Sequence, residues 1–536
     1  MAGNKKVRYV AVAPCVPLGR RGQDSYTYYV SSEDEIDLGY VVKIPFGKRS
    51  IMGVVTALDL QRPSYPTKQI KTITAVQLTD TQMQFAQWLS DACHGGFGFT
   101  ARLFLPGSFT KLASSARIPV KKKKEGKPMV IIEKNSVLRL EVIAQYARKH
   151  SSAGGQVLIL VPEVAMLSVY EKLFAPEIRN STAMTYHAGL LQSEKKSVWQ
   201  AVESSDCRII IGTQKALFLP FYNLTSVVVD EEQSDSYKLW DQYPRLHTVA
   251  GAQLLAHISH ASLLYATAYP SLFLRHAIAE NTCEVIVDNP VIPKTHIYPF
   301  SFEDRKWKRA IPEELGNKAR TWARSGKHVL ILFNKKDDVE LKKSLFRKLS
   351  AIAKKHMHIG TVGILTHPPR TQFDYVVWLF PEWTLRAIDY RSAERAKIMS
   401  ARLAEFTKNA DVYIGSRYAD IAKDLFGVPE KAWGEKALKQ RKRFHLPPYS
   451  QLVRLTVRDK TNAKAYGRAL DMRGVFDGAI KKKKDITVYG PYQELGAKKK
   501  QISDYHLLLS GDIKKLIPLY KKLPVDAADV MPYRVV

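Results

Sequence analysis

Short runs of β-branched and other apolar residues alternate with helical patterns through the middle of the chain. The runs PMVIIE, GQVLILVPE, CRIIIGT and SVVVDEE lie between residues 128 and 232 and have the length of strands buried on both faces. Helical stretches such as RLEVIAQYARKH separate these runs. Strands that alternate with helices in this way predict βαβ units and a doubly wound parallel sheet.

The rest of the chain predicts three further units. The runs KHVLILFN, HIGTVGIL and DYVVWLFPE indicate a second parallel sheet. Near the N-terminus, short runs separated by turn residues predict a small β-barrel or sandwich, followed by a helix with Thr79 as its N-cap. The C-terminal stretch predicts a small α+β unit. We therefore expect an α/β multidomain protein with domains at 1–115, 129–290, 291–430 and 431–536 and a basic linker at 116–128.

Two carboxylates, Asp230 and Glu231, directly follow the run of three valines in SVVVDEE. This pattern predicts a buried parallel strand that ends at a site. In an ATPase, acidic residues in this place hold magnesium and activate water. Asp230 and Glu231 are therefore the candidate catalytic carboxylates, and the question becomes whether the chain also has a loop for the phosphates of a nucleotide.

The charge balance points to an anionic partner. The chain has 82 Lys and Arg against 51 Asp and Glu, a formal net charge of +31, and its lysines include blocks that start at Lys121, Lys481 and Lys498. A field of this sign favours a polyanion, and nucleic acid is the leading partner class. Phosphate contacts made by such residues are sensitive to salt and indifferent to sequence.

The four cysteines, Cys15, Cys93, Cys207 and Cys283, lie far apart in sequence. Their spacing contains no CxxC zinc pair and no disulfide framework, so we expect a cytoplasmic protein without a metal site. No apolar run of the sequence approaches the roughly 20 residues that span a bilayer, so we expect no membrane association.

Several segments, in collinear order, resemble the PriA family of superfamily two replication-restart helicases. The resemblance covers nearly the whole chain. The matching segments are VAVAPCVPLGRRGQDSYTYYV, DLGYVVKIPFGKRSIMGVV, LILVPEVAML, TYHAGL, IIIGTQKALFLPFYNL, VVVDEEQSDSYK, FPEWTLRAIDYRSAER and ALKQRKRFHLPPYSQLVRL.

This resemblance implies a β-rich domain that binds the three-prime end of DNA, followed by two RecA-like helicase lobes and a C-terminal α+β domain. It also implies forked, single-stranded or three-prime-ended DNA as the partner. Single-strand-binding protein and factors that load the replicative helicase are the protein partners that it suggests.

The phosphate loop of the family is absent from its expected place. The family has GxTGSGKTE shortly before VLILVPE, whereas an ungapped alignment puts EKNSVLRLE there, from residue 133 to 141. The glycines that let backbone N–H groups converge on phosphate are gone, and Val137 and Leu138 put side chains where phosphate would lie. The degenerate loop positions are Ser136, Leu138, Arg139 and Leu140, with Arg139 at the lysine position and Leu140 at the hydroxyl position.

Other motor parts also depart from the family. The SATP coupling motif reads TAYP, with Tyr269 in place of its threonine. The two arginine-finger positions hold Phe406 and Asn409. The stretch after VLILFN has no cysteine, so we expect no zinc-binding insertion, and a short basic linker takes the place of the family's winged helix. Joint loss of these parts predicts a motor that no longer hydrolyses ATP.

DNA-facing segments survive better than ATP-facing ones. The triplet from Tyr26 to Tyr28 occupies the base-stacking place of the family's first domain, although alternating tyrosines also occur as strand packing. The turn that follows Phe46 carries two cationic side chains, Lys48 and Arg49. They are candidate phosphate contacts, and ordinary surface charge is the alternative interpretation. The candidate DNA contacts are Tyr26, Thr27, Tyr28, Phe46, Gly47, Lys48, Arg49 and Lys215.

Three functions compete on this basis. The first is a DNA-binding protein of replication restart with an inactive helicase motor, which needs no cofactor. The second is an active ATP-dependent DNA helicase with an atypical nucleotide site, which needs ATP and magnesium. The third is a scaffold whose charge serves protein or RNA contacts. The better survival of DNA-facing segments favours the first.

Overall fold

The computed structural model describes residues 7–18, 24–106, 126–239, 243–306, 310–333, 355–361, 363, 372–386, 389–480, 485–493 and 503–532. Most of the predicted linker, the three lysine blocks and most of the segment after VLILFN lie outside the described residues. No helix among the described residues combines the length and the hydropathy that crossing a membrane requires.

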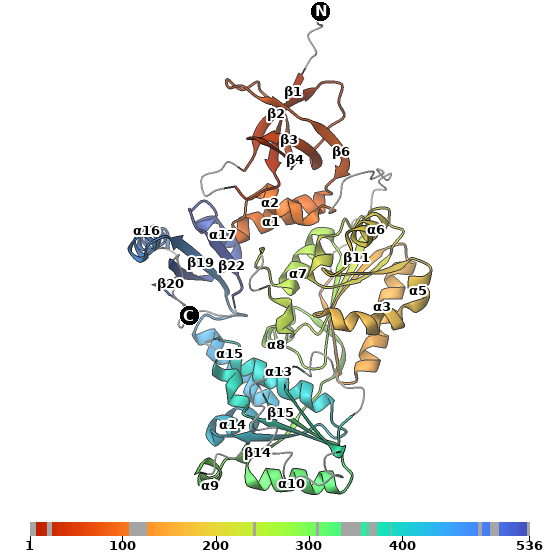
Figure 1. The fold of residues 1–536 in the computed structure, drawn as a ribbon, viewed down its shortest axis with the longest axis vertical. Helices are drawn as coiled ribbons and strands as arrows, with labels where there is room; N and C mark the ends of the chain where they lie inside the picture. Colours follow the sequence, from red (N-terminus) through yellow and green to blue (C-terminus); the bar gives the residue numbers. More distant parts are fainter. Residues whose placement is uncertain are drawn as a thin grey trace, which may run out of the picture.

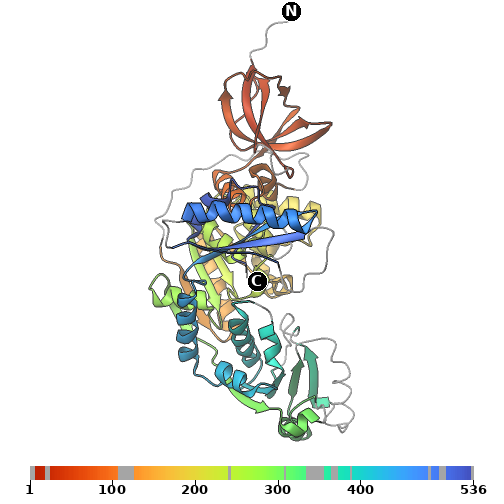
Figure 2. The ribbon, with the colours of Figure 1, turned by 90° about the vertical axis from the view of Figure 1, so that its left-hand side faces the viewer.

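The N-terminal unit is a half-barrel of β-strands (Figures 1 and 2). Its strand order is β5-β2-β1-β4-β3-β6. Val10 and Val12 of β1, together with Val42, Ile44 and Val55, fill its inside, because alternate residues of a strand share a face. The strands are β1 (Val7–Pro14), β2 (Tyr26–Ser31), β3 (Tyr40–Phe46), β4 (Arg49–Leu60), β5 (Lys68–Gln69) and β6 (Thr72–Gln77).

Two helices, α1 (Asp80–Cys93) and α2 (Phe97–Ala101), close the half-barrel on the side of the remaining units. The side chain of Thr79 accepts a hydrogen bond from the backbone N–H of Gln82 and forms a capping box with it, which confirms Thr79 as the N-cap.

Lobe 1 is a seven-stranded sheet in the order β13-β7-β12-β11-β8-β10-β9, paired in parallel throughout. Helices cover both faces, and the central β11 is therefore buried almost along its whole length. Its strands are β7 (Met129–Glu133), β8 (Gln156–Leu160), β9 (Ala183–Tyr186), β10 (Ile209–Gly212), β11 (Leu224–Asp230), β12 (Ser262–Thr267) and β13 (Glu284–Asn289). Its helices include α3 (Ser136–Ser152), α4 (Leu167–Leu173), α5 (Ala175–Arg179), α6 (Gln192–Glu203), α7 (Thr248–Ser259) and α8 (Leu272–Ala279).

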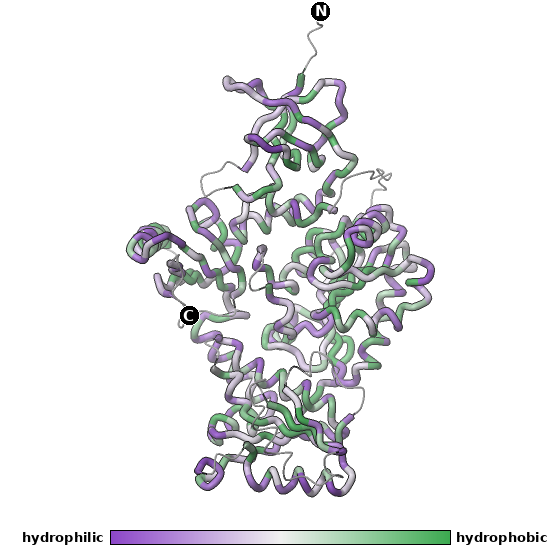
Figure 3. Tube along the Cα trace, in the orientation of Figure 1, coloured by the Kyte–Doolittle hydropathy of each residue, from purple (hydrophilic) through white to green (hydrophobic). Residues whose placement is uncertain are grey.

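Lobe 2 is a five-stranded parallel sheet in the order β14-β18-β17-β15-β16. Figure 3 shows that the apolar segments of this lobe lie in its central strands. Helix α10 packs on one face, while α13, α14 and α15 pack on the other. The strands are β14 (Lys294–Pro299), β15 (Val329–Phe333), β16 (Met357–Thr361), β17 (Tyr375–Leu379) and β18 (Asp411–Ser416), and the helices include α9 (Phe302–Lys306), α10 (Glu313–Arg324), α13 (Ser392–Glu405), α14 (Ala419–Phe426) and α15 (Glu430–Arg443).

The C-terminal unit is a four-stranded antiparallel sheet in the order β20-β21-β19-β22. It packs against both α1 and lobe 1: Tyr520 donates a hydrogen bond to the carbonyl of Ala92 at 2.7 Å, and the Lys238 ammonium lies 2.6 Å from the Asp529 carboxylate. Its elements are β19 (Gln451–Asp459), α16 (Asn462–Ile480), β20 (Thr487–Tyr492), β21 (Ser503–Gly511), α17 (Ile513–Tyr520) and β22 (Ala527–Val530).

The arrangement of these units matches the predicted fold class, an α/β chain with two parallel-sheet lobes between a β-rich and an α+β unit. The predicted domain limits stay predictions. Helix α15 packs against the core of lobe 2 through Trp433.

Candidate functional site

The turn between β7 and α3 stands where the phosphate loop would be, and its own side chains satisfy the N-terminus of α3. The Asn135 side chain accepts hydrogen bonds from the backbone N–H groups of Val137 at 3.0 Å and Leu138 at 3.3 Å. The Glu133 carboxylate accepts from the Asn135 backbone and from the Asn289 amide. These N–H groups are the ones a bound phosphate would need, and an N-cap side chain already uses them.

Arg139 lies inside the turn and is buried, with 4% of its surface exposed. Its guanidinium donates to the carbonyl of Glu133 at 2.8 Å and forms an ion pair with the Glu231 carboxylate. Its Nε lies 3.5 Å from Asp230. The lysine position of the loop therefore carries a cation that contacts both candidate catalytic carboxylates.

The remaining carboxylate oxygens have other partners. The Tyr170 hydroxyl donates to Asp230 at 2.8 Å, and the Gln233 amide donates to Glu231 at 2.6 Å. Burial, only partly offset by Arg139, raises the pKa of Asp230 to about 6. For Glu231 burial acts in the same direction, but the charges of Arg139 and Arg402 and the hydrogen bond from Gln233 together outweigh it and hold the pKa of this carboxyl below its usual value.

A cavity of about 1050 Å³ lies between the two lobes and is lined by Arg139, Asp230 and Glu231 on one side. Phe406 and Asn409, at the predicted finger positions, line it from lobe 2. Val137 and Leu138 are 60% and 46% exposed, and of the two only Val137 lines the cavity. Arg139 is the buried residue of this turn. Ser136 and Leu140 also line the cavity.

Two lobe 2 residues that sequence reasoning missed also belong to this cavity, Arg402 and Glu405. Burial, together with the charge of Glu231, raises the pKa of Glu405 to about 8. Both residues lie on α13, three positions apart, but only the packing of the two lobes brings Glu405 close to Glu231. A charged residue at a buried helix position was the one available signal.

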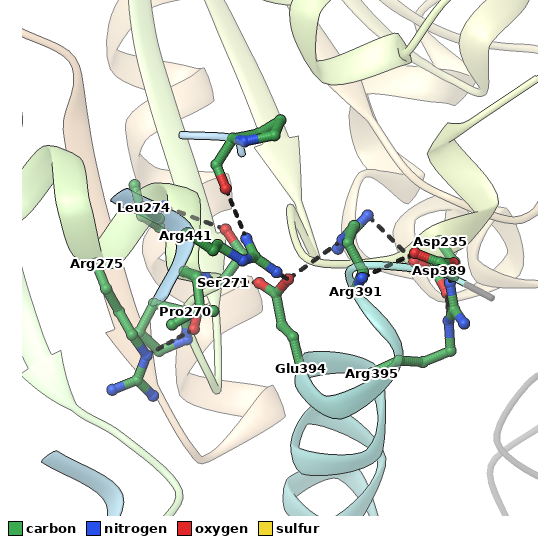
Figure 4. Close-up of polar contacts among 12 residues, drawn as sticks. Asp235, Pro270, Ser271, Leu274, Arg275, Asp389, Arg391, Glu394, Arg395 and Arg441 are labelled. Atoms are coloured by element: carbon green, nitrogen blue, oxygen red, sulfur yellow. Dashed lines mark hydrogen bonds and ion pairs between the residues drawn. The ribbon is translucent and has the colours of Figure 1, made fainter. Parts of the chain in front are cut away.

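A network of buried ion pairs joins the lobes beside this cavity (Figure 4). Glu394 of α13 accepts from the backbone N–H of Leu272 in lobe 1 at 2.7 Å and pairs with Arg441 at 2.8 Å and with Arg391 at 3.3 Å. Burial opposes its charge, but Arg441 and Arg391 lower the pKa of Glu394 to about 2. Arg391 also reaches Asp235 of lobe 1 at 3.2 Å.

Tyr269, the residue at the coupling-motif position, takes part in a second contact between the lobes. Its hydroxyl donates to the Glu430 carboxylate at the start of α15. Arg275 and Lys397 pair with the same carboxylate at 3.1 and 2.9 Å. Arg395 of lobe 2 pairs with Asp235 of lobe 1 and with Asp389.

The N-terminal candidates divide into a packed group and an exposed group. Tyr28 is 5% exposed, and its hydroxyl donates to the carbonyl of Pro45, so it is a core residue. The rings of Tyr26 and Phe46 meet edge to face at 5.5 Å, and both are partly exposed. Thr27 accepts a hydrogen bond from the Tyr65 hydroxyl at 3.1 Å.

The exposed group is the turn between β3 and β4. Gly47 has a φ of 56°, in the left-handed region that favours glycine, and Lys48 and Arg49 follow it fully on the surface. Lys215 lies apart from this unit, in the 3₁₀ turn Gln214–Phe218 after β10 of lobe 1. It is half-buried, and burial together with nearby Lys195 lowers its pKa.

Comparison with known families identifies the N-terminal unit. Residues 13–106 match the family model described as the 3′DNA-binding domain of PriA. The replication restart protein PriA of Rickettsia prowazekii is 25% identical over 239 residues, which are 39% of this chain and 36% of the relative. The PriA of Haemophilus influenzae is 34% identical over 134 residues, which are 25% of this chain and 18% of the relative. The matches therefore span 36% of the first of these relatives and 18% of the second.

Solved structures with a related arrangement include RecG bound to a three-way DNA junction. It has a TM-score of 0.35 and 14% identity and covers 70% of this chain and 45% of that one. The Mycobacterium smegmatis helicase Lhr bound to single-stranded DNA and AMP-PNP has a TM-score of 0.36 and 11% identity, with 55% and 44% covered.

Two parallel-sheet lobes that face each other across a cleft, with carboxylates at the end of a central strand, define a two-lobed α/β protein. Residues 13–106 thus resemble a PriA 3′DNA-binding domain, and the relatives that match by sequence are replication restart proteins PriA.

Proposed function

We propose that this chain is a DNA-binding protein of replication restart whose helicase-like lobes do not hydrolyse ATP. The observation that carries the proposal is the pairing of Arg139 with Asp230 and Glu231. Magnesium requires oxygen ligands in near-ideal octahedral geometry, and the carboxylates that would supply them already bind a guanidinium. Removing Arg139 from this pairing leaves buried charges unpaired, which costs about 3–5 kcal/mol.

The other contacts that a bound nucleotide would need are also occupied or missing. The N–H groups of α3 are capped by Asn135, so a phosphate would have to displace an existing hydrogen bond. The finger positions carry Phe406 and Asn409, neither of which supplies the positive charge that an arginine finger places beside a transferring phosphoryl group. The side chains present therefore do not fit ATP and magnesium together.

DNA binding rests on the N-terminal domain and on charge. The turn at Gly47 presents Lys48 and Arg49 to solvent, and partly exposed Tyr26 and Phe46 lie close to it in the same unit. With a net charge of +31, the chain attracts phosphate backbones without regard to sequence. We propose forked, single-stranded or three-prime-ended DNA as the ligand, and single-strand-binding protein and helicase-loading factors as the partners.

All four cysteines are free and buried, in keeping with the expected cytoplasmic location.

The contacts between the lobes give the inactive motor a structural role. Glu394, Glu430 and Asp235 tie lobe 1 to lobe 2. A motor needs its lobes to move, whereas a platform for DNA needs them held. We propose that the lobes form one rigid body that positions the N-terminal domain relative to a fork.

Fork-DNA mobility shifts test the DNA part of this proposal. We expect affinity to fall about tenfold or more between 50 and 200 mM salt, because phosphate contacts release counterions. Lys48→Ala should weaken the complex, and Lys436→Ala, which removes an exposed lysine that pairs with Asp424, should leave it unchanged. Affinity that is independent of salt would contradict the proposal.

The second candidate, an active helicase with an atypical site, is favoured by one observation. The cavity between the lobes keeps a volume of about 1050 Å³, and Lys134, Lys294, Arg402 and Lys408 line it. Strand displacement from a labelled fork, with and without ATP and magnesium, separates the two candidates. Displacement that depends on ATP supports the helicase, and its absence under conditions in which the fork is bound supports the proposal.

A further inference from the structure

Five aromatic side chains gather on one face of the lobe 2 sheet, next to α10. The pairing of the parallel strands accounts for this, because paired residues and residues two apart share a face. Tyr413 of β18 pairs with His296 of β14 and with Val377 of β17. Tyr298 lies two positions from His296 on β14, and Tyr375 lies two positions from Val377 on β17. Trp322 of α10 reaches them from the helix. We call His296, Tyr298, Trp322, Tyr375 and Tyr413 the aromatic cluster.

Tyr413 lies at the centre of this cluster. Its ring is stacked on His296 at 4.5 Å between centroids, and Trp322 and Tyr375 lie 4.7 and 5.9 Å away. Tyr298 lies 6.2 Å away on the far side, toward the sheet edge. The rings therefore form one continuous surface that starts at β14, the edge strand of the sheet.

This surface packs on the core of lobe 2, is partly exposed to solvent and is bordered by cations. The side chain of His296 is 43% exposed, and the four other members are partly exposed. The Lys318 ammonium lies 4.8 Å from the centroid of the Tyr298 ring and donates to its hydroxyl at 2.6 Å. Lys294 is exposed at the start of β14 on the same face. Two carboxylates lie near: Glu314 is 3.4 Å from Lys318, and Asp411 is 2.9 Å from His296.

We propose that the aromatic cluster binds unpaired bases of single-stranded DNA, with Lys318 and Lys294 contacting the phosphates. Aromatic surfaces next to cations are the combination that binds single strands without sequence preference, and each stacked base contributes about 1–3 kcal/mol. A protein partner fits less well, because polarisable rings beside lysines on a chain of net charge +31 complement a polyanion. The inference rests on the DNA-binding function proposed above.

The position of the cluster gives it a role distinct from that of the N-terminal domain. Figures 1 and 2 place β14 and α10 at the opposite end of the molecule from the half-barrel. A fork held at its three-prime end by residues 13–106 would thus have its single-stranded arm held a second time on lobe 2. Two separated contacts on one rigid body select DNA that carries both an end and a single-stranded arm.

Photo-crosslinking tests the inference directly. The probe is a fork that carries 5-iodouracil along its single-stranded arm, crosslinked to the full chain and mapped by mass spectrometry. We expect crosslinks on peptides that contain Tyr298, Trp322 or Tyr413. Crosslinks confined to residues 13–106 would overturn the inference and leave the proposed function standing. Absence of both crosslinks and fork binding would remove the proposed function as well.

Matched variants give a second readout. Tyr413→Leu keeps an apolar side chain but removes the ring, and it should weaken binding of an oligothymidylate about 5- to 100-fold, while Tyr413→Phe should bind like the unaltered chain. Lys318→Ala should lower the salt dependence of that binding. Tyr418→Ala, at an exposed position of the same lobe outside the cluster, is the control and should change nothing. Equal binding by Tyr413→Leu and the unaltered chain, with unfolding midpoints that agree, would overturn the inference.

Discussion

The guanidinium of Arg139 forms a buried ion pair with the carboxylate of Glu231, across 92 residues of sequence, at the inner end of the cleft between the lobes. The position that carries a phosphate-binding lysine in the family therefore holds a cation that is already neutralised. The same carboxylate accepts from Gln233, so its two oxygens are both engaged. The cleft is open, but the groups that would grip a triphosphate are bonded to each other.

Replacing Arg139 tests whether this pairing is structural. Arg139→Gln should lower the free energy of unfolding by about 3–5 kcal/mol, because Asp230 and Glu231 lose their buried counter-ion. Urea unfolding measures the change. Arg148→Gln, which removes the more exposed pair with Glu177, should cost about 1 kcal/mol or less. Similar losses in the two variants would argue against a tightly paired site.

Restoring the family lysine should not restore nucleotide binding. In Arg139→Lys, the ammonium still faces Asp230 and Glu231, and Asn135 still caps α3. We expect no binding of a fluorescent ATP analogue with magnesium. Binding in the micromolar range by this single variant would mean that the loop backbone remains competent and that Arg139 alone blocks the site.

The raised pKa of Glu405 predicts a pH dependence of stability. A carboxyl group whose folded-state pKa is about 8, above an unfolded value near 4.3, holds its proton more tightly in the folded state. Its contribution to stability is therefore largest at low pH and is lost as pH rises from about 4.3 to about 8. Glu405→Gln should flatten this part of the profile and be relatively more stable at pH 8 than at pH 5. Parallel profiles of the two proteins in urea unfolding would contradict this assignment.

Separating the lobes should require removal of their ion pairs. Glu394→Gln leaves Arg391 and Arg441 with less compensation and should broaden the distribution of distances between fluorophores on lobe 1 and lobe 2. Single-molecule energy transfer measures this distribution of distances. Glu177→Gln alters a pair within lobe 1 and serves as the control. A broad distribution in the unaltered chain would contradict the rigid arrangement.

Patterns local to one strand or helix predicted the fold well. The valine run identified β11 and placed Asp230 at its end, and Thr79 identified the start of α1. Such signals are local because a buried strand is apolar along its length and an N-cap lies within one turn of its helix. The position of Arg139 at the loop was also visible from the sequence.

Long-range pairings could not be predicted. Glu394 contacts Leu272 from 122 residues away, and no local pattern distinguishes a carboxylate that crosses between lobes from one on a surface. The same limit affected the DNA candidates: alternation in β2 could not separate buried Tyr28 from partly exposed Tyr26, because the two share a face of the strand and Tyr26 is its first residue, where cover depends on the tertiary fold.

Titration of the full chain with a fluorescent ATP analogue in the presence of magnesium tests the central claim most directly. The account predicts no saturable binding up to millimolar nucleotide by protein that still binds fork DNA. Saturable binding in the micromolar range, lost when magnesium is chelated, would contradict it.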